Sequence, residues 1–193
     1  MRALVLASTS RYRADLLARL GLPFTQEAPG VDEAPLPGEA PDVLAPRLAA
    51  AKALAVAQRR PGALVIGSDQ VAVLDGAALG KPGTAAAAEA QLARASGRSV
   101  EFLTAVALAD AGRGCVGRAL DRTRVRFRTL STDEIRRYVA REQPLDCAGS
   151  FRSEALGVAL FESIETRDPA ALVGLPLIEL CRMLREAGVD PLG

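Results

Sequence analysis

The chain has 193 residues, of which 49% are hydrophobic and 24% charged, a length that buries a sizeable core and predicts one domain over residues 1–193. The 24 Lys and Arg residues are nearly balanced by 23 Asp and Glu residues. The net charge of +1 therefore provides no general attraction to nucleic acid polymers or to anionic membranes.

The N-terminal third of the chain predicts a strand, a helix and a second, longer helix. An apolar run at residues 3–7 is typical of a buried strand, and polar residues 8–10 separate it from an amphipathic helix that ends at Gly21. Residues 28–41, rich in Pro, Gly and acidic residues, predict a loop before an alanine-rich helix at about 42–60.

The first residues turn polar too soon for a signal peptide, and no apolar run is long enough to span a membrane. We therefore expect a soluble, cytoplasmic protein.

The next segment predicts a second buried strand at residues 63–67, interrupted by the polar residues 68–70. The apolar run 71–74 follows and ends at an Asp75–Gly76 turn. A further helix is predicted over about 84–96. Strand and helix thus continue to alternate.

The C-terminal half predicts an antiparallel hairpin of strands 100–109 and 115–129. Ser131 and Glu134 have the spacing of a capping box and open a helix through about 141. A strand at 157–164 and a helix at 177–186 complete the chain. The alternation predicts an α/β fold, with helices on both faces of a mixed sheet.

Three predicted loops leave strands with polar or charged residues, at 8–13, 67–70 and 79–82. In α/β sheets ligands bind beyond the strand ends, so these loops could share one cleft. The chain contains no histidine, which excludes Ser-His-Asp and Cys-His catalysis and His-based zinc sites. Acid–base chemistry is therefore left to carboxylates.

The first of these loops is suited to phosphate. Backbone N–H groups at the start of a helix, together with Ser8, Arg11 and Arg13, could converge on phosphate oxygen atoms. The alternative is that Ser10 only caps the helix and that both arginines are solvated.

The other candidates are two carboxylates and two lysines. Asp69 follows an apolar strand directly, which suits a base or a metal ligand, although such an Asp also often starts a turn. Glu33 lies in the acidic loop, where it either binds Mg²⁺ or is simply solvated. Lys52 and Lys81 are the only lysines among the 24 basic residues, and a compact ammonium is suited to phosphate, although a lone lysine is also common on a solvated surface.

The motifs LVLASTSRYRADLL, VDE, VIGSDQVAVLDGAALGKP, CAGSFRSEALG and VGLPLIELCRML stand in the order of the Maf family of nucleotide pyrophosphatases, which the chain resembles over nearly its whole length. The resemblance implies a Maf/inosine-triphosphatase-like α/β/α sandwich with a mixed central sheet and a large cleft between two lobes. It also implies cleavage of a nucleoside triphosphate to a monophosphate and diphosphate, a divalent cation (Mg²⁺ or Mn²⁺) and a possible homodimer.

Residue roles follow from the same resemblance. It implies that Asp69 is the proton acceptor and also a metal ligand with Glu33, and that Lys52 and Lys81 are catalytic. Substrate would be bound by five residues, namely Ser8, Tyr12, Arg13, Gln70 and Glu154. Relatives often carry two adjacent arginines near position 13, whereas here Ala14 follows Arg13 and the extra guanidinium belongs to Arg11.

Three of the motifs resemble the branch of the family that hydrolyses 7-methyl-GTP. The N7-methylated base is cationic, so we expect it to gain a cation–π interaction with Tyr12 and to donate a charge-assisted hydrogen bond to Glu154. Two alternatives stay open: a pyrophosphatase acting on dTTP, UTP or another modified nucleotide, and a non-catalytic nucleotide-binding regulator of cell division.

Overall fold

The computed structural model describes residues 2–193 and separates into two compact units. The first unit contains the residues up to Gln70, together with Thr104–Asp121 and Asp168–Gly193. The second unit contains Val71–Leu103 and Arg122–Arg167. Among the described residues, no helix combines the length and the apolar character needed to cross a membrane. The cleft between lobes and the single domain over 1–193 stay predictions.

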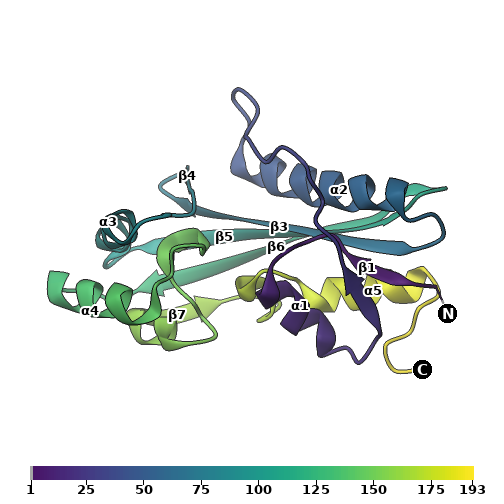
Figure 1. Ribbon diagram of the computed structural model, residues 1–193. Helices are drawn as coiled ribbons and strands as arrows, with labels where there is room; N and C mark the ends of the chain where they lie inside the picture. Colours follow the sequence, from purple (N-terminus) through teal and green to yellow (C-terminus); the bar gives the residue numbers. More distant parts are fainter. Residues whose placement is uncertain (1) are drawn as a thin grey trace. The chain divides into compact units, whose positions relative to one another are not determined.

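A mixed seven-stranded sheet runs through the chain in the order β2-β1-β3-β5-β6-β7, with β4 paired to β3 (Figure 1). β1 runs parallel to β2 and β3, whereas the β3–β4 and β6–β7 pairs are antiparallel, which confirms the predicted α/β fold with a mixed sheet. The strands are β1 (Leu4–Leu6), β2 (Phe24–Gln26), β3 (Leu64–Leu74), β4 (Ala77–Leu79), β5 (Ser99–Asp110), β6 (Gly114–Phe127) and β7 (Phe161–Glu165). The helices are α1 (Arg11–Ala18), α2 (Pro41–Arg59), α3 (Ala85–Ala95), α4 (Thr132–Glu142) and α5 (Leu177–Glu186).

In the first unit, helices cover both faces of the sheet: α2 lies on one face, and α1 and α5 lie on the other (Figure 1). Leu64 and Ile66 of β3 belong to a buried core that also includes leucines of α1 and α5. Gly67 faces α2, because a Cβ atom built on it would lie 2.2 Å from the carbonyl oxygen of Ala49. Successive residues of β3 therefore alternate between the α1/α5 face and the α2 face.

The prediction that β3 ends before residues 68–70 is wrong, because the strand runs without a break from Leu64 to Leu74. The polar side chains of Ser68, Asp69 and Gln70 all have hydrogen-bond partners within the first unit, so they do not force the chain out of the sheet. The Asp75–Gly76 turn is confirmed: both residues have positive φ, +54° and +77°, and they join β3 to β4 as a two-residue hairpin loop. The three-residue strands β2 and β4 were not predicted.

In the second unit, α3 packs against α4, and four phenylalanines form a cluster of edge-to-face contacts with ring centroids 4.7 to 5.7 Å apart. The strand predicted over residues 157–164 is partly wrong, since Leu156–Leu160 form a 3₁₀ helix before β7 begins. The chain turns tightly here: the N–H of Gly157 donates to the carbonyl oxygen of Arg152, and a Cβ atom at Gly157 would lie 2.2 Å from that oxygen. The aromatic cluster consists of Phe102, Phe127, Phe151 and Phe161.

The capping box of α4 is confirmed. The Glu134 N–H donates to the Ser131 hydroxyl at 3.3 Å, and the Glu134 carboxylate accepts from the Ser131 N–H at 2.8 Å. The same carboxylate forms an ion pair with Arg128 at 2.9 Å. The backbone hydrogen bond from Ser131, followed by the bond from Arg128, lowers the pKa of Glu134 from 4.5 to about 2.

We therefore expect Glu134 to make the protein more sensitive to acid. A carboxylate with a lowered pKa in the folded state contributes its full stability above its unfolded pKa, 4.5, and loses it as the pH falls toward about 2. Glu134→Gln should flatten the pH dependence of the free energy of unfolding over this range, as measured by urea titrations at several pH values. Exposed Glu165→Gln is the control, and equal pH dependence in both variants would contradict the role of Glu134.

Candidate functional site

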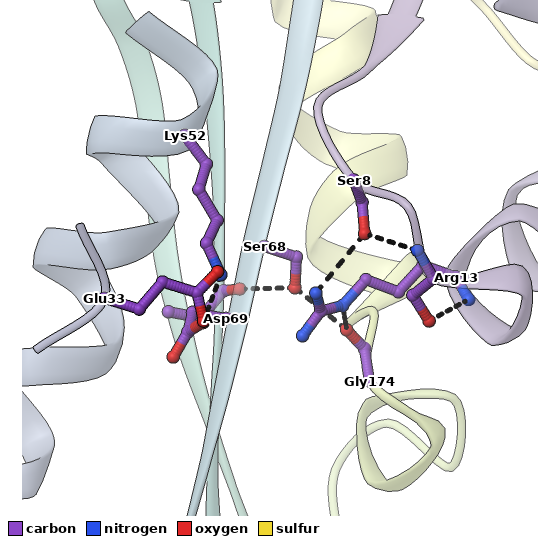
Figure 2. Close-up of polar contacts among 9 residues, drawn as sticks. Ser8, Arg13, Glu33, Lys52, Ser68, Asp69 and Gly174 are labelled. Carbon is purple, nitrogen blue, oxygen red and sulfur yellow. Dashed lines mark hydrogen bonds and ion pairs between the residues drawn. The ribbon is translucent and has the colours of Figure 1, made fainter. Parts of the chain in front are cut away.

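The first part of the candidate site is a buried lysine between two carboxylates (Figure 2). Lys52 Nζ of α2 lies 2.7 Å from Asp69 Oδ1 of β3 and 2.7 Å from Glu33 Oε1. Lys52 is 4% exposed and Asp69 is 6% exposed, whereas the side chain of Glu33 is 53% exposed. The predicted residues Glu33, Lys52 and Asp69 are thus brought together by the fold.

Local packing explains how Lys52 reaches Asp69. Small residues on the buried face of α2, with Gly67 opposite them on β3, let helix and strand backbones approach closely. Asp69 is on the same face of β3 as Gly67, so its side chain points toward α2. A buried ammonium and a buried carboxylate are each costly unless paired, so the ion pair offsets part of the cost of burying Lys52 and Asp69.

The second part of the site is built around Arg13, on the other side of β3 (Figure 2). The Ser10 hydroxyl caps α1 by accepting from the N–H of Arg13, as the sequence allows. Arg13 Nε donates to the carbonyl oxygen of Gly174 at 2.9 Å, and Nη1 donates to the hydroxyl of buried Ser8 at 3.5 Å. Both acceptors are neutral, so neither cancels the positive charge of Arg13.

Electrostatics links the two parts of the site. Burial lowers the pKa of Arg13 below its ordinary value, and the negative charges of Asp69 and Glu33 oppose this shift. The carboxylates are therefore near enough to influence the guanidinium, although its hydrogen bonds go to Gly174 and Ser8. Arg13 can attract an anion, and the carboxylates of Asp69 and Glu33 can attract a cation. Together they suit an anionic ligand that binds as a complex with a metal cation.

Tyr12 and Arg11 form a pair at the start of α1. The guanidinium carbon of Arg11 lies 4.9 Å from the centroid of the Tyr12 ring, and Arg11 Nη2 donates to the Tyr12 hydroxyl at 3.1 Å. Arg11 thus already makes a cation–π contact with the ring. These contacts hold the Arg11 guanidinium against the Tyr12 ring.

Gln70 is held by its amide nitrogen. Gln70 Nε2 lies 3.0 Å from three acceptors, the Thr104 hydroxyl and the carbonyl oxygens of Ala171 and Leu172. Carbonyl oxygens can only accept hydrogen bonds, so the end of the Gln70 side chain that faces them must be its NH₂ group. The Gln70 oxygen is therefore the atom that can contact a base, and it can only accept a hydrogen bond.

The remaining predicted residues, Lys81 and Glu154, belong to the second unit. Both are exposed, and Glu154 accepts a 3.4 Å hydrogen bond from the Ser153 hydroxyl. The contacts described for the first unit do not involve them. Their roles stay predictions.

The carboxylates offer a limited metal site. Among residues 2–193, no three His, Cys, Asp or Glu side chains gather as a metal-binding group. Mg²⁺ is usually held by one or two carboxylates together with substrate phosphates and water. Asp69 and Glu33, both hard oxygen donors in the same cluster, fit such an ion if the substrate supplies the other ligands.

Three site residues were missed by sequence reasoning: Ser68, Thr104 and Gly174. The Ser68 hydroxyl, which has one proton to donate, lies 2.7 Å from the carbonyl oxygen of Ala105 and 2.9 Å from that of Gly174. Thr104 donates to the carbonyl oxygen of Ala171 at 3.0 Å. Two polar residues within buried strands are a signal that could have identified Ser68 and Thr104, whereas Gly174 acts through its backbone and left no such signal.

Comparison with known proteins identifies the family. The family model described as Maf-like protein matches residues 3–187. The 7-methyl-GTP pyrophosphatase of Xanthomonas oryzae pv. oryzae (strain MAFF 311018) is 61% identical over 188 residues, which cover 97% of this chain and 98% of that protein. The 7-methyl-GTP pyrophosphatase of Chromohalobacter salexigens is 56% identical over 193 residues and the full length of both chains.

Among solved structures, the chain is similar to the Staphylococcus aureus Ham1 protein, with a TM-score of 0.48 and 16% identity over 81% of this chain and 90% of that chain. The family match covers nearly all of the chain, and it includes every residue of the two clusters described above. This chain belongs to the Maf family.

Proposed function

We propose that this protein hydrolyses 7-methyl-GTP to 7-methyl-GMP and diphosphate and so removes a modified nucleotide from the cellular pool. Relatives that are 56% and 61% identical over nearly the full length bear the name 7-methyl-GTP pyrophosphatase, which supports the proposal. The observation that carries it is the buried Lys52–Asp69 ion pair on one face of β3, with Arg13 held by neutral groups on the opposite face of that strand. This arrangement supplies a base and a cation for phosphoanhydride chemistry.

In the proposed reaction, Asp69 accepts a proton from a water molecule that attacks the α-phosphorus. The new bond joins the water oxygen to phosphorus, the bond to the α–β bridging oxygen breaks, and diphosphate leaves. Lys52 orients the Asp69 carboxylate, and Arg13 stabilises charge on the phosphate oxygens, with Lys81 as a further cation. A divalent cation, Mg²⁺ or Mn²⁺, would be held by Asp69 and Glu33 and would neutralise the triphosphate.

Base selection is assigned to Tyr12, Gln70 and Glu154. A cationic 7-methylguanine that stacks on Tyr12 must either use the ring face opposite Arg11 or displace that guanidinium. The Gln70 oxygen accepts from an N–H on the base, which matches the N–H groups along the guanine edge. Glu154 would accept a charge-assisted hydrogen bond from an N–H of the cationic base.

The direct test is a panel of 7-methyl-GTP, GTP, dTTP and UTP incubated with purified protein and Mg²⁺, with diphosphate release as the readout. We expect 7-methyl-GTP to give the highest kcat/KM. Faster cleavage of dTTP or UTP would assign the protein to the pyrimidine branch. Nucleotide binding without cleavage of any member would support the non-catalytic regulator.

Glu154→Gln is expected to lower kcat/KM for 7-methyl-GTP by about tenfold, the loss typical of one charge-assisted hydrogen bond, and to leave UTP cleavage unchanged. Kinetics on both nucleotides give the measurement. Exposed Glu162→Gln, in the same unit, is the matched control. If Glu154→Gln affected both nucleotides equally, Glu154 would have no role in base selection.

We further propose that the protein acts in the cytoplasm as a homodimer, as its family membership suggests. Sedimentation velocity of the purified chain at several concentrations would measure its mass in solution. A monomer at all concentrations would exclude the dimer and leave the proposed chemistry untouched.

A further inference from the structure

The carbonyl oxygen of Gly174 is shared by two donors from different elements. Arg13 Nε of α1 and Ser68 Oγ of β3 each lie 2.9 Å from it. Ser68 is fully buried at 0% exposed, and its hydroxyl also lies 2.7 Å from the carbonyl oxygen of Ala105 in β5. The single hydroxyl proton is therefore shared between β5 and the segment that carries Gly174.

This contact determines which edge of the Arg13 guanidinium is available. Arginine can present two edges for paired hydrogen bonds, one formed by Nε with an Nη group and one formed by the two Nη groups. Because Nε donates to Gly174, the edge formed by Nε is already in use. The two Nη groups of Arg13 are therefore the ones that can bind a phosphate. Nη1 makes a long contact of 3.5 Å with the Ser8 hydroxyl, which a phosphate oxygen could replace.

The backbone at Gly174 is suited to this role. Its φ of +122° is a conformation that residues with a Cβ atom rarely adopt. A Cβ atom at this position would lie 3.5 Å from Arg13 Nε, in direct contact with the guanidinium stem. Gly174 thus gives the chain a turn that aims its carbonyl oxygen at Arg13.

We propose that Ser68 and Gly174 are positioning residues that fix the Arg13 guanidinium with its Nη groups toward the substrate phosphates. Ser68 holds the Gly174 carbonyl oxygen in place, and that oxygen holds Arg13 Nε. Neither residue contacts the reacting atoms. The inference rests on the proposed function, in which Arg13 binds phosphate oxygens.

The test is a double-mutant cycle read by binding of inorganic diphosphate with Mg²⁺ in a calorimeter. Ser68→Ala is expected to weaken diphosphate binding by about five- to tenfold when Arg13 is present, a loss typical of one hydrogen bond. In the Arg13→Gln background, the same change should alter affinity by less than about twofold, because Ser68 acts through Arg13. Should Ser68→Ala fail to fold, Ser68→Cys, which keeps a weak donor, replaces it in both backgrounds.

Ser96→Ala provides the matched control. It also removes a partly buried serine hydroxyl near a carbonyl oxygen, that of Leu130 at 3.4 Å, but Ser96 belongs to the second unit and to neither cluster of the candidate site. It should leave diphosphate affinity unchanged. An equal loss in Ser96→Ala, additive effects of Ser68→Ala and Arg13→Gln, or no binding of diphosphate by the unaltered protein would each overturn the inference.

The two proposals fail in different ways. The diphosphate experiment requires no turnover. If the protein cleaves no nucleotide but shows the expected coupling, the positioning of Arg13 is supported and the proposed activity is contradicted. If the protein cleaves 7-methyl-GTP but the effects of Ser68→Ala and Arg13→Gln are additive, the proposed activity is supported and the positioning of Arg13 is contradicted.

Discussion

Asp69→Asn is expected to lower kcat for 7-methyl-GTP by about a thousandfold, because a positioned general base contributes roughly 10² to 10⁴ to rate. Asparagine has nearly the same shape, and its side-chain oxygen can still accept the 2.7 Å hydrogen bond from Lys52 Nζ. The buried ammonium therefore keeps a partner, and loss of fold does not confound the result. Steady-state diphosphate release gives the rate, and calorimetry gives nucleotide affinity, which should change by less than about tenfold.

Asp75→Asn, in the turn that follows the same strand, is the matched control for Asp69→Asn. Asp75 is exposed, and asparagine tolerates its positive φ of +54°. This variant should retain full turnover. Turnover of Asp69→Asn within about threefold of the unaltered protein would remove Asp69 from the mechanism.

Gly67→Ala is expected to produce the largest loss of stability, about 3 kcal/mol or more, because overpacking against a backbone cannot be relieved by a side-chain rotation. The added Cβ would lie 2.2 Å from the Ala49 carbonyl oxygen and 2.7 Å from the Ala53 nitrogen. Helix α2 would have to move away from β3, and with it Lys52. Thermal unfolding should show a Tm lower by about 10 °C for a chain of this size.

Gly112→Ala is the control for added volume, since its Cβ would meet only the Asp110 carboxylate oxygen at an ordinary 3.5 Å. Its Tm should stay within about 2 °C of the unaltered protein, because surface changes of this kind have small effects. Any folded Gly67→Ala protein should also show reduced turnover, as Lys52 no longer reaches Asp69. A Tm unchanged by Gly67→Ala would contradict the close approach of helix and strand.

The sequence predicted those elements whose signals are local. The helices at 42–60, 84–96 and 177–186 agree closely with α2, α3 and α5, because runs of helix-forming and apolar residues are encoded within each segment. It failed at residues 67–70, where polar side chains indicated a loop. Those side chains find their partners on α2, on β5 and in the 168–174 segment, which are distant in sequence and invisible to a local pattern.

The candidate site also contains residues that the sequence identified and contacts that it did not. Motif resemblance identified Glu33, Lys52 and Asp69, and the structure places a carboxylate oxygen of Glu33 and one of Asp69 each 2.7 Å from the Lys52 ammonium. It did not assign a role to Ser68, because the carbonyl oxygens near this hydroxyl lie in β5 and at Gly174, far away in sequence. Nor did it show that Arg11 lies over the Tyr12 ring, since the contact depends on side-chain direction at the first turn of a helix.

The alternation along β3 also limits how the length of this protein can change. The strand directs Asp69 toward α2, and Ser68 and Gln70 toward the opposite face. Inserting or deleting one residue between Leu64 and Ser68 would rotate every later side chain to the wrong face, exchanging the proposed base with its neighbours. Insertions and deletions are therefore expected to survive in connections such as Ala111–Arg113 but not within β3, even where the added residue is as small as alanine.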